Sequence, residues 1–492
     1  MKIRFLSGIL LSALSGILIL LSFPPYGIWP LAWIGLIPCL IAQYRFFPVK
    51  WSSLAPALAI LFWLGPFLAR LFGSEFGPVF EYLGVWIALL IFFLQKERKF
   101  IESTEYRWFI LQGVTGWVGF EMVRVSFIPL VATSGFIGYT QSTQPWVIQP
   151  VSIFGIFGLD LVILLVNFSL AQGLLVWFDR QWKPAHAVSV NGIAARRWGI
   201  ITGFILVAWI GLSVIILLSF PKDTPKVRVA TVRPGFALPA HRDSVSNSQV
   251  RFDKFAIQIR EAASKGAQII YSPEMLFNFN PQAEYTEQFR MLARETGAYL
   301  FITYTVSAEG EPWRNESVML SPAGNFSAVY GKNHTWGIGE PTTPTAGNFV
   351  VYDTPLGKLA GLICHDANYT DIARKLSYRG ARIIAAPYCE FGGFGEQAWN
   401  NVLFRAVENR TAFILSGTNT VSAIINPDGT VVALNTDIKG SDTILVGNIN
   451  AGPDHAPYTK LGDIMGWVSL AGMIFFIVFQ IIEQHNKHPS RV

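Results

Sequence analysis

The stretch Ala267-Gln268-Ile269-Ile270-Tyr271-Ser272-Pro273-Glu274 is an apolar run that ends at a proline and a carboxylate. A short Ile-rich run before a turn signal predicts a buried β-strand. Helical spacing flanks it at residues 252–264 and 286–296, and a second strand-like run follows at 299–305. Helices alternating with strands predict an α/β sandwich.

Three polar residues follow such runs in the order needed for acyl transfer. Glu274, Lys332 and Cys364 each come at the end of a predicted strand or in the loop after it. A thiol attacks a carbonyl carbon, a carboxylate takes and returns the proton, and an ammonium group stabilises the oxyanion. Taken singly, a residue such as Glu274 is usually a cap, one such as Lys332 a solvated charge, and one such as Cys364 a core thiol. Their ordered combination favours a catalytic set, in which Lys332 is expected to favour the thiolate.

Further candidates lie close to these three in the sequence. Glu340 is a second carboxylate for the pocket, with a surface position equally consistent, and Trp336 is expected to cover the pocket or to pack on the domain. His365 and Asp366 adjoin Cys364 on a predicted strand, 359–364. Strand neighbours point to opposite faces, which disfavours His365 as the base.

The composition divides the chain into apolar and ordinary parts. Of its 492 residues, 51% are hydrophobic and 14% charged, against about 25% charged in soluble domains. Residues 1–220 and 461–492 carry apolar runs around an ordinary domain at 221–460. Runs of bilayer-spanning length cover approximately residues 6–22, 28–44, 52–71, 79–95, 108–128, 151–177, 198–220 and 462–482. These features predict a polytopic α-helical membrane protein of about eight spans with an inserted α/β domain.

Basic residues cluster in alternate loops between the apolar runs. They are Lys2, Arg4, Arg45, Lys50, Lys96, Arg98, Lys99, Arg107, Arg180, Lys183, Arg196, Arg197, Lys487 and Arg491. The positive-inside rule then places both termini in the cytoplasm and the domain at 221–460 outside. Because the net charge of +6 is spread over loops, it does not predict nucleic-acid binding.

Ordered motifs run along nearly the whole chain. They are Phe23-Pro24-Pro25-Tyr26-Gly27-Ile28-Trp29-Pro30; Trp117, Glu121 and Arg124; Gly138-Tyr139-Thr140-Gln141; Glu274, Lys332, Glu340 and Cys364; Arg405-Ala406-Val407-Glu408-Asn409; and Pro427-Asp428-Gly429. Together they resemble the apolipoprotein N-acyltransferases, the membrane branch of the nitrilase (carbon–nitrogen hydrolase) superfamily. The resemblance implies an αββα nitrilase-like domain with a Glu274–Lys332–Cys364 triad. It also implies acyl transfer from a phospholipid, through a cysteine thioester, to the amino-terminal cysteine of a diacylglyceryl lipoprotein at the cytoplasmic (inner) membrane.

The chain departs from the family pattern around the nucleophile. Cys364-His365-Asp366 stands where the family has Cys-Tyr-Glu, and the segment from Lys332 to Cys364 is short, which predicts a trimmed active-site arm. These loops shape the acceptor pocket. One alternative is therefore a membrane-anchored amidase that hydrolyses an exported amide substrate. A catalytically silent lipoprotein-binding protein is another. We expect no metal or other cofactor, and a monomer.

Overall fold

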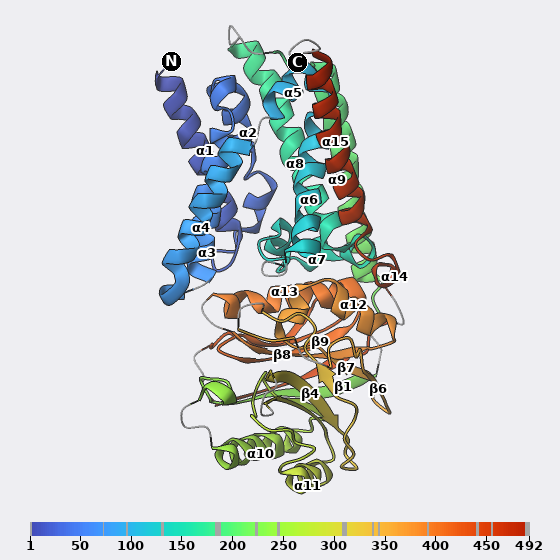
Figure 1. Cartoon of the computed structure of the whole chain (residues 1–492). Coiled ribbons are helices and arrows are strands. Elements are labelled where there is room, and N and C mark those ends of the chain that lie inside the picture. Colours follow the sequence, from blue (N-terminus) through green and yellow to red (C-terminus); the bar gives the residue numbers. More distant parts are fainter. Residues whose placement is uncertain are drawn as a thin grey trace.

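The structure is a computed structural model that describes residues 2–487 except 72, 95–96, 129–131, 183–187, 222–224, 244–246, 308–311, 337–338, 343–344, 391–392, 439–441 and 454–455. Figure 1 shows helices at one end of the molecule and two stacked sheets at the other, with both labelled termini at the end of the helices away from the sheets. The division between an apolar helical part and a sheet domain agrees with the prediction from composition.

The sheet domain contains two six-stranded sheets. The first has the order β12-β1-β2-β3-β4-β5 and the second β11-β10-β9-β8-β7-β6. Their bounds are β1 Lys226–Pro234, β2 Ile269–Tyr271, β3 Tyr299–Val306, β4 Arg314–Leu320, β5 Tyr330–Gly331, β6 Val351–Thr354, β7 Gly357–Gly361, β8 Ile383–Cys389, β9 Ala412–Thr418, β10 Ser422–Ile425, β11 Val431–Asn435 and β12 Asp442–Asn450. The neighbours β1, β2 and β3 are parallel, as are β7, β8 and β9.

Helices cover both outer faces of the paired sheets, giving the expected αββα layers. The helices α10 (Ser248–Ser264) and α11 (Thr286–Thr296) pack on the first sheet, and α12 (Asp371–Tyr378) and α13 (Phe394–Asn409) on the second. Apolar side chains such as Ile269 and Leu359 fill the space between the sheets. In Figure 1, α12 and α13 lie between the second sheet and the helical part.

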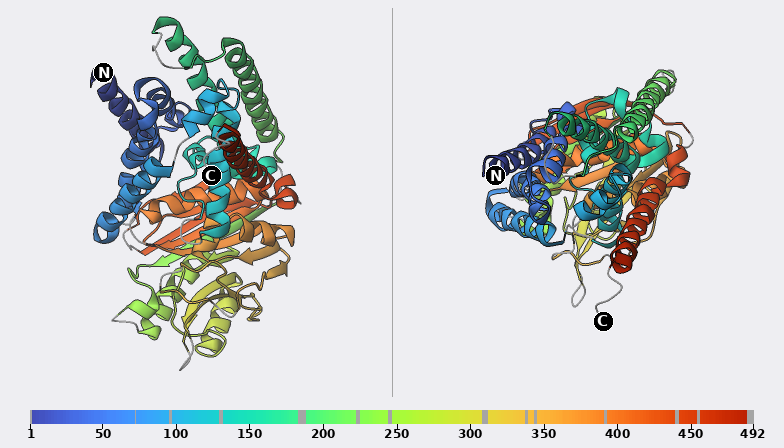
Figure 2. Two further views of the ribbon diagram at one scale, coloured as in Figure 1. Left: turned by 45° about the horizontal axis from the view of Figure 1, so that its top comes forward. Right: turned by 90° about the horizontal axis from the view of Figure 1, so that it is seen from above.

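The helical part is built from several apolar helices. They are α1 Lys2–Ser22, α2 Ile37–Ile41, α3 Leu54–Leu71, α4 Gly73–Leu94, α5 Glu97–Ser103, α6 Phe109–Phe127, α7 Pro145–Ile148, α8 Val151–Gln181, α9 Gly192–Leu218, α14 Pro457–Leu461 and α15 Ile464–Lys487. Within the described residues, five helical segments are long and apolar enough to cross a membrane. Seen from above in Figure 2, this part covers the sheet domain, with α15 returning beside the earlier helices although it follows the sheets in sequence.

The segment predicted as a second span, 28–44, is not one helix. It forms a 3₁₀ turn (Trp29–Trp33), the short α2 and a π turn (Ala42–Phe46). Pro30 and Pro38 lie in the first turns of two of these pieces, because proline lacks the N–H that would continue a preceding helix. Asn167 of α8 bonds to the Leu36 N–H at 3.0 Å and to the Ala32 carbonyl at 2.9 Å. A side chain thus satisfies backbone groups that the broken helix leaves open.

A glutamate of the sheet domain stabilises a break in α8. Gly155 has φ 66°, inside the left-handed region, and a Cβ there would lie 2.6 Å from the Tyr458 ring. Directly after this break, the Ile156 N–H donates to Glu408 of α13 at 2.9 Å. Glu408 also lies 2.8 Å from Arg405, and both side chains are fully buried. This contact fastens the sheet domain to the helical part.

Candidate active site

The predicted catalytic residues meet at the carboxyl ends of strands from both sheets. Glu274 follows β2, Lys332 follows β5, and Cys364 comes three residues after β7 ends at Gly361. The side chain of Glu274 is 1% exposed and that of Lys332 is 4% exposed. Cys364 is 5% exposed. Side chains beyond the carboxyl ends of strands are the usual place for chemistry in α/β folds.

Lys332 lies between two carboxylates. Its Nζ contacts Glu274 Oε1 at 3.1 Å and Glu340 Oε2 at 2.9 Å. The Asn315 Nδ2 group donates to both carboxylates, at 2.8 and 2.9 Å. Burial by itself lowers the pKa of Lys332, but the charges of Glu274 and Glu340 outweigh it and raise the pKa well above its usual value. Lys332 is therefore charged in the resting site, and Glu340 is drawn into the pocket rather than lying on the surface.

The two carboxylates differ in their proton affinity. Burial raises the pKa of Glu274, with the opposing pull of Lys332 too weak to cancel it. Burial by itself also raises the pKa of Glu340. Lys332, Asn315 and the Trp336 N–H, which donates at 2.8 Å, outweigh burial and lower this pKa overall. Paired carboxyl groups with pKa values pushed apart are typical of acid–base sites. Glu274 therefore holds a proton more readily than Glu340, whose negative charge is favoured by its neighbours.

Cys364 is held in a strained turn rather than on a strand. The prediction that residues 359–364 form one strand is wrong at its end, because Cys364 begins the 3₁₀ turn Cys364–Asn368 with φ 47°. A non-glycine residue at positive φ is uncommon and persists only where its surroundings hold it. The argument from strand alternation therefore does not apply to His365.

The side chain of Cys364 favours the thiol form over the thiolate. Burial, and then the charges of Glu274 and Glu390, raise the pKa of Cys364 well above its usual value, while Lys332 opposes them. Lys332 does lower the pKa of Cys364, as expected, but the effect of burying the thiol is larger. A buried thiol of this kind can act as a nucleophile only where a neighbouring base takes its proton.

Asp366 ties the Lys332 loop to the Cys364 turn. Its Oδ1 accepts the N–H groups of Asn333 at 3.1 Å and His334 at 2.7 Å. Its Oδ2 accepts the Tyr330 hydroxyl at 2.7 Å and the Ile363 N–H at 3.0 Å. A fully buried carboxylate with four donors holds backbone from two sheets in one arrangement, so its contacts are with the protein framework.

His365 and Trp336 form an aromatic wall beside this turn. The His365 Nδ1 lies 3.0 Å from Asn368 Nδ2, and its ring packs edge-on against Trp336 with centroids 5.4 Å apart. Trp336 also packs against Phe394, again at 5.4 Å. This position agrees with the expectation that Trp336 packs on the domain.

Two residues of the site were not predicted from the sequence. Glu390 Oε1 accepts a hydrogen bond from Cys364 Sγ at 3.3 Å, and Asn315 bridges the two other carboxylates. Glu390 directly follows β8, which ends at Cys389, and Asn315 lies within β4, which begins at Arg314. The rule that selected Glu274, a carboxylate directly after a buried strand, finds Glu390 once β8 is extended. The Cys389 backbone N–H donates to Glu274 Oε2 at 2.8 Å.

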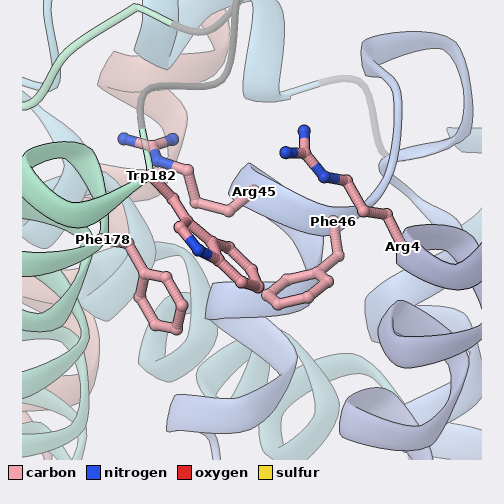
Figure 3. A pocket seen from close by; sticks show the side chains of 5 residues that line it. All are labelled: Arg4, Arg45, Phe46, Phe178 and Trp182. Atoms are coloured by element: carbon pink, nitrogen blue, oxygen red, sulfur yellow. The ribbon is translucent and has the colours of Figure 1, made fainter. Parts of the chain in front are cut away.

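Two small cavities lie in the helical part or at its edge. One is lined by Phe23, Pro24, Ser134, Gly135, Tyr139, Gln397, Asn400 and Asn401. Asn401 donates to Asn368 of the turn at 2.6 Å. The other, at the opposite end of the helices, is lined by Arg4, Arg45, Phe46, Phe178 and Trp182 (Figure 3). Among the described residues no set of His, Cys, Asp and Glu side chains is arranged to hold a metal ion.

A buried thiol, a lysine between carboxylates and an αββα sandwich together define a carbon–nitrogen hydrolase domain. Residues 229–452 match the carbon–nitrogen hydrolase family, and residues 15–169 match the apolipoprotein N-acyltransferase amino-terminal domain. The chain belongs to the apolipoprotein N-acyltransferase family.

Individual relatives match either nearly the whole chain or less than half of it. The apolipoprotein N-acyltransferase of Geobacter metallireducens is 23% identical over 94% of this chain and 93% of its own length. The mouse deaminated glutathione amidase is 27% identical over 39% of this chain and 71% of its own. A crystal structure of an amidase from Nesterenkonia covers 49% of this chain and 95% of its own, at 19% identity and a TM-score of 0.41.

Proposed function

We propose that this protein transfers an acyl chain from a membrane phospholipid to the amino-terminal cysteine amine of a diacylglyceryl lipoprotein, through a thioester on Cys364. The observation that carries this proposal is the position of the nucleophile. The Asn368 carbonyl, at the end of the Cys364 turn, accepts the N–H and hydroxyl of Thr133 from the helical part, at 3.3 and 2.7 Å. A thiol beside apolar helices is well placed for a substrate whose chains lie in a bilayer. The full-length relative supports the same activity, whereas the amidases match only the sheet domain.

The reaction follows a two-step cycle. In acylation, the thiol proton passes to a buried carboxylate, Cys364 Sγ bonds to the ester carbonyl carbon, and the glycerol oxygen leaves with a proton. In transfer, the lipoprotein amine attacks the thioester, Glu274 takes its proton and returns it to sulfur, and the C–S bond breaks. Lys332 uses two of its three N–H donors on Glu274 and Glu340. The third is available to the oxyanion.

The remaining predicted site residues support this chemistry. Glu340 keeps Lys332 charged, and Asp366 sets the distance between the Lys332 loop and the nucleophile. Trp336 and His365 provide an aromatic wall for the acyl chain. All these groups belong to one chain, which supports action as a monomer.

The membrane arrangement is part of the proposal. Residues 1–220 and 461–492 form the membrane part, with eight crossings in which 28–44 crosses as a broken segment. Residues 221–460 form the catalytic domain on the outer face of the inner membrane. The alternation of basic loops supports this orientation.

The test is a direct assay of both half-reactions. Purified protein is incubated with phospholipid and a synthetic diacylated lipopeptide that has a free amino-terminal cysteine, and the products are weighed by mass spectrometry. We expect one added acyl chain on the amine. Release of free fatty acid with an unchanged lipopeptide would show that water rather than the amine resolves the thioester, as the hydrolytic alternative requires, and no turnover of either substrate would contradict acyl transfer.

A further inference from the structure

A carboxylate outside the Glu274–Lys332–Cys364 set contacts the thiol directly. Cys364 Sγ donates to Glu390 Oε1 at 3.3 Å, and both residues are buried. Glu390 follows β8, the parallel neighbour of β7, so adjacent strands deliver the two side chains to one edge. The Glu390 N–H donates to the Thr418 carbonyl at 3.2 Å, which fixes the backbone at this point.

Glu274 is already engaged by other groups. Its Oε1 accepts from Asn315 and Lys332, and its Oε2 accepts from the Cys389 N–H. An ionised carboxylate has about four acceptor positions, so Glu274 keeps one for an incoming amine proton. Among the hydrogen bonds of the described residues, the thiol donates to Glu390 and not to Glu274.

We propose that Glu390 is a catalytic residue that accepts the Cys364 thiol proton in the acylation step, whereas Glu274 serves the amine in the transfer step. The inference rests on the proposed function, because it assigns a role within acyl transfer at Cys364. The S–H bond breaks as the proton passes to Glu390 Oε1, and Sγ bonds to the ester carbonyl carbon. When the tetrahedral intermediate collapses, the C–O bond to glycerol breaks and Glu390 returns the proton to the leaving oxygen.

The charges around Glu390 suit this role. Its pKa is affected by four neighbouring groups, Glu274, Lys332, Glu340 and Cys364. Burial, and then the charge of Glu274, raise the pKa of Glu390 to about 7, while the thiol hydrogen bond and Lys332 oppose the increase. A general base is most effective with a pKa near the working pH. Acyl-enzyme formation should therefore rise with pH through about 7, as the carboxylate loses its proton.

Two rates measured on Glu390→Gln separate a base from a merely structural carboxylate. Acyl-enzyme formation from a soluble p-nitrophenyl ester should fall by about 10²–10⁴-fold, the usual loss for one positioned proton transfer, and its rise near pH 7 should disappear. Alkylation of Cys364 by iodoacetamide, followed on its peptide by mass spectrometry, should not slow. The Glu390 charge raises the pKa of Cys364, so its removal should instead speed alkylation. Unchanged acylation, or a parallel fall of both rates, would overturn the inference.

Control variants keep the outcomes distinct. Glu390→Asp retains a carboxylate and should recover part of the acylation rate, which a packing role alone would not produce. Glu295→Gln makes the same change on an exposed carboxylate paired with Arg260 and should match the parent. If the parent forms no acyl-enzyme, or Cys364→Ala still transfers acyl chains, the proposed function itself fails. If the parent acylates normally and Glu390→Gln does too, only the role of Glu390 fails.

Discussion

At the residue scale, burial and a few hydrogen bonds assign different tasks to chemically similar carboxyl groups. Glu340 is kept ionised by Lys332 and Asn315, whereas Glu274 and Glu390 have raised pKa values because burial outweighs their partners. The same desolvation keeps the Cys364 thiol protonated. The site is thus poised for proton transfer between neighbours rather than for a preformed thiolate.

Cys364→Ser should abolish detectable acyl-enzyme, because a hydroxyl is a much weaker nucleophile than a thiol at neutral pH. Cys39→Ala should retain activity, since Cys39 is buried among helices. Cys389→Ala should also retain it, because residue 389 reaches Glu274 through its backbone N–H. The measurement is mass spectrometry of the intact protein after incubation with phospholipid. Parental acylation of Cys364→Ser would contradict the assignment.

Trp336→Ala should weaken the use of long-chain acyl donors more than that of short-chain soluble esters. The side chain packs against Phe394 and His365 next to the nucleophile turn, where an extended chain needs an apolar wall. Rates of thioester formation with donors of two chain lengths give the comparison. Equal losses for both donors would show that Trp336 supports the turn rather than the acyl chain.

At the element scale, helix α13 joins the surroundings of Cys364 to the helical part. Its amino-terminal residue Phe394 packs on Trp336 beside the active site, and Glu408 near its other end caps the second half of α8 at Ile156. Arg410, just beyond it, bonds to Gln149 and Ser152. One helix therefore positions the sheet domain against the helices.

Glu408→Ala should destabilise the folded protein. The change removes the carboxylate that pairs with the buried Arg405 and that accepts the Ile156 N–H. Breaking a buried ion pair costs about 3–5 kcal/mol. Thermal unfolding in detergent should shift to clearly lower temperature. Glu287→Ala removes an exposed carboxylate paired with Arg290 and should change little. Equal stability of the two variants would rule out a fastening role for Glu408.

At the scale of the whole molecule, the chain returns to the helical part after building both sheets. The helix α15 packs on α6 and α8, so segments far apart in sequence share one bundle (Figure 1). The arrangement predicts that the connections at both ends of the sheet domain lie on one side of the membrane.

A reporter active only in the cytoplasm should stay silent when fused after Ala451 and should work when fused after Lys50. The expected difference follows from the basic residues that flank alternate spans. Reporter activity and expression level are measured for both fusions in intact cells. An active fusion after Ala451 would reverse the proposed orientation of the catalytic domain.

The sequence alone was enough to separate the apolar helices from the α/β domain and to select Glu274, Lys332 and Cys364 at strand ends. These features depend on local periodicity and on residues a few positions apart, which a linear reading detects. It did not reveal the break at 28–44, the contact of Cys364 with Glu390, or the bridge that Asn315 makes between Glu274 and Glu340. Those groups are brought together only when strands pair and helices dock, with 26 and 41 residues separating Cys364 from Glu390 and Asn315 from Glu274. Desolvation in that assembled pocket also reverses the expected state of the thiol, since burial is a property of the packed molecule and not of a sequence position.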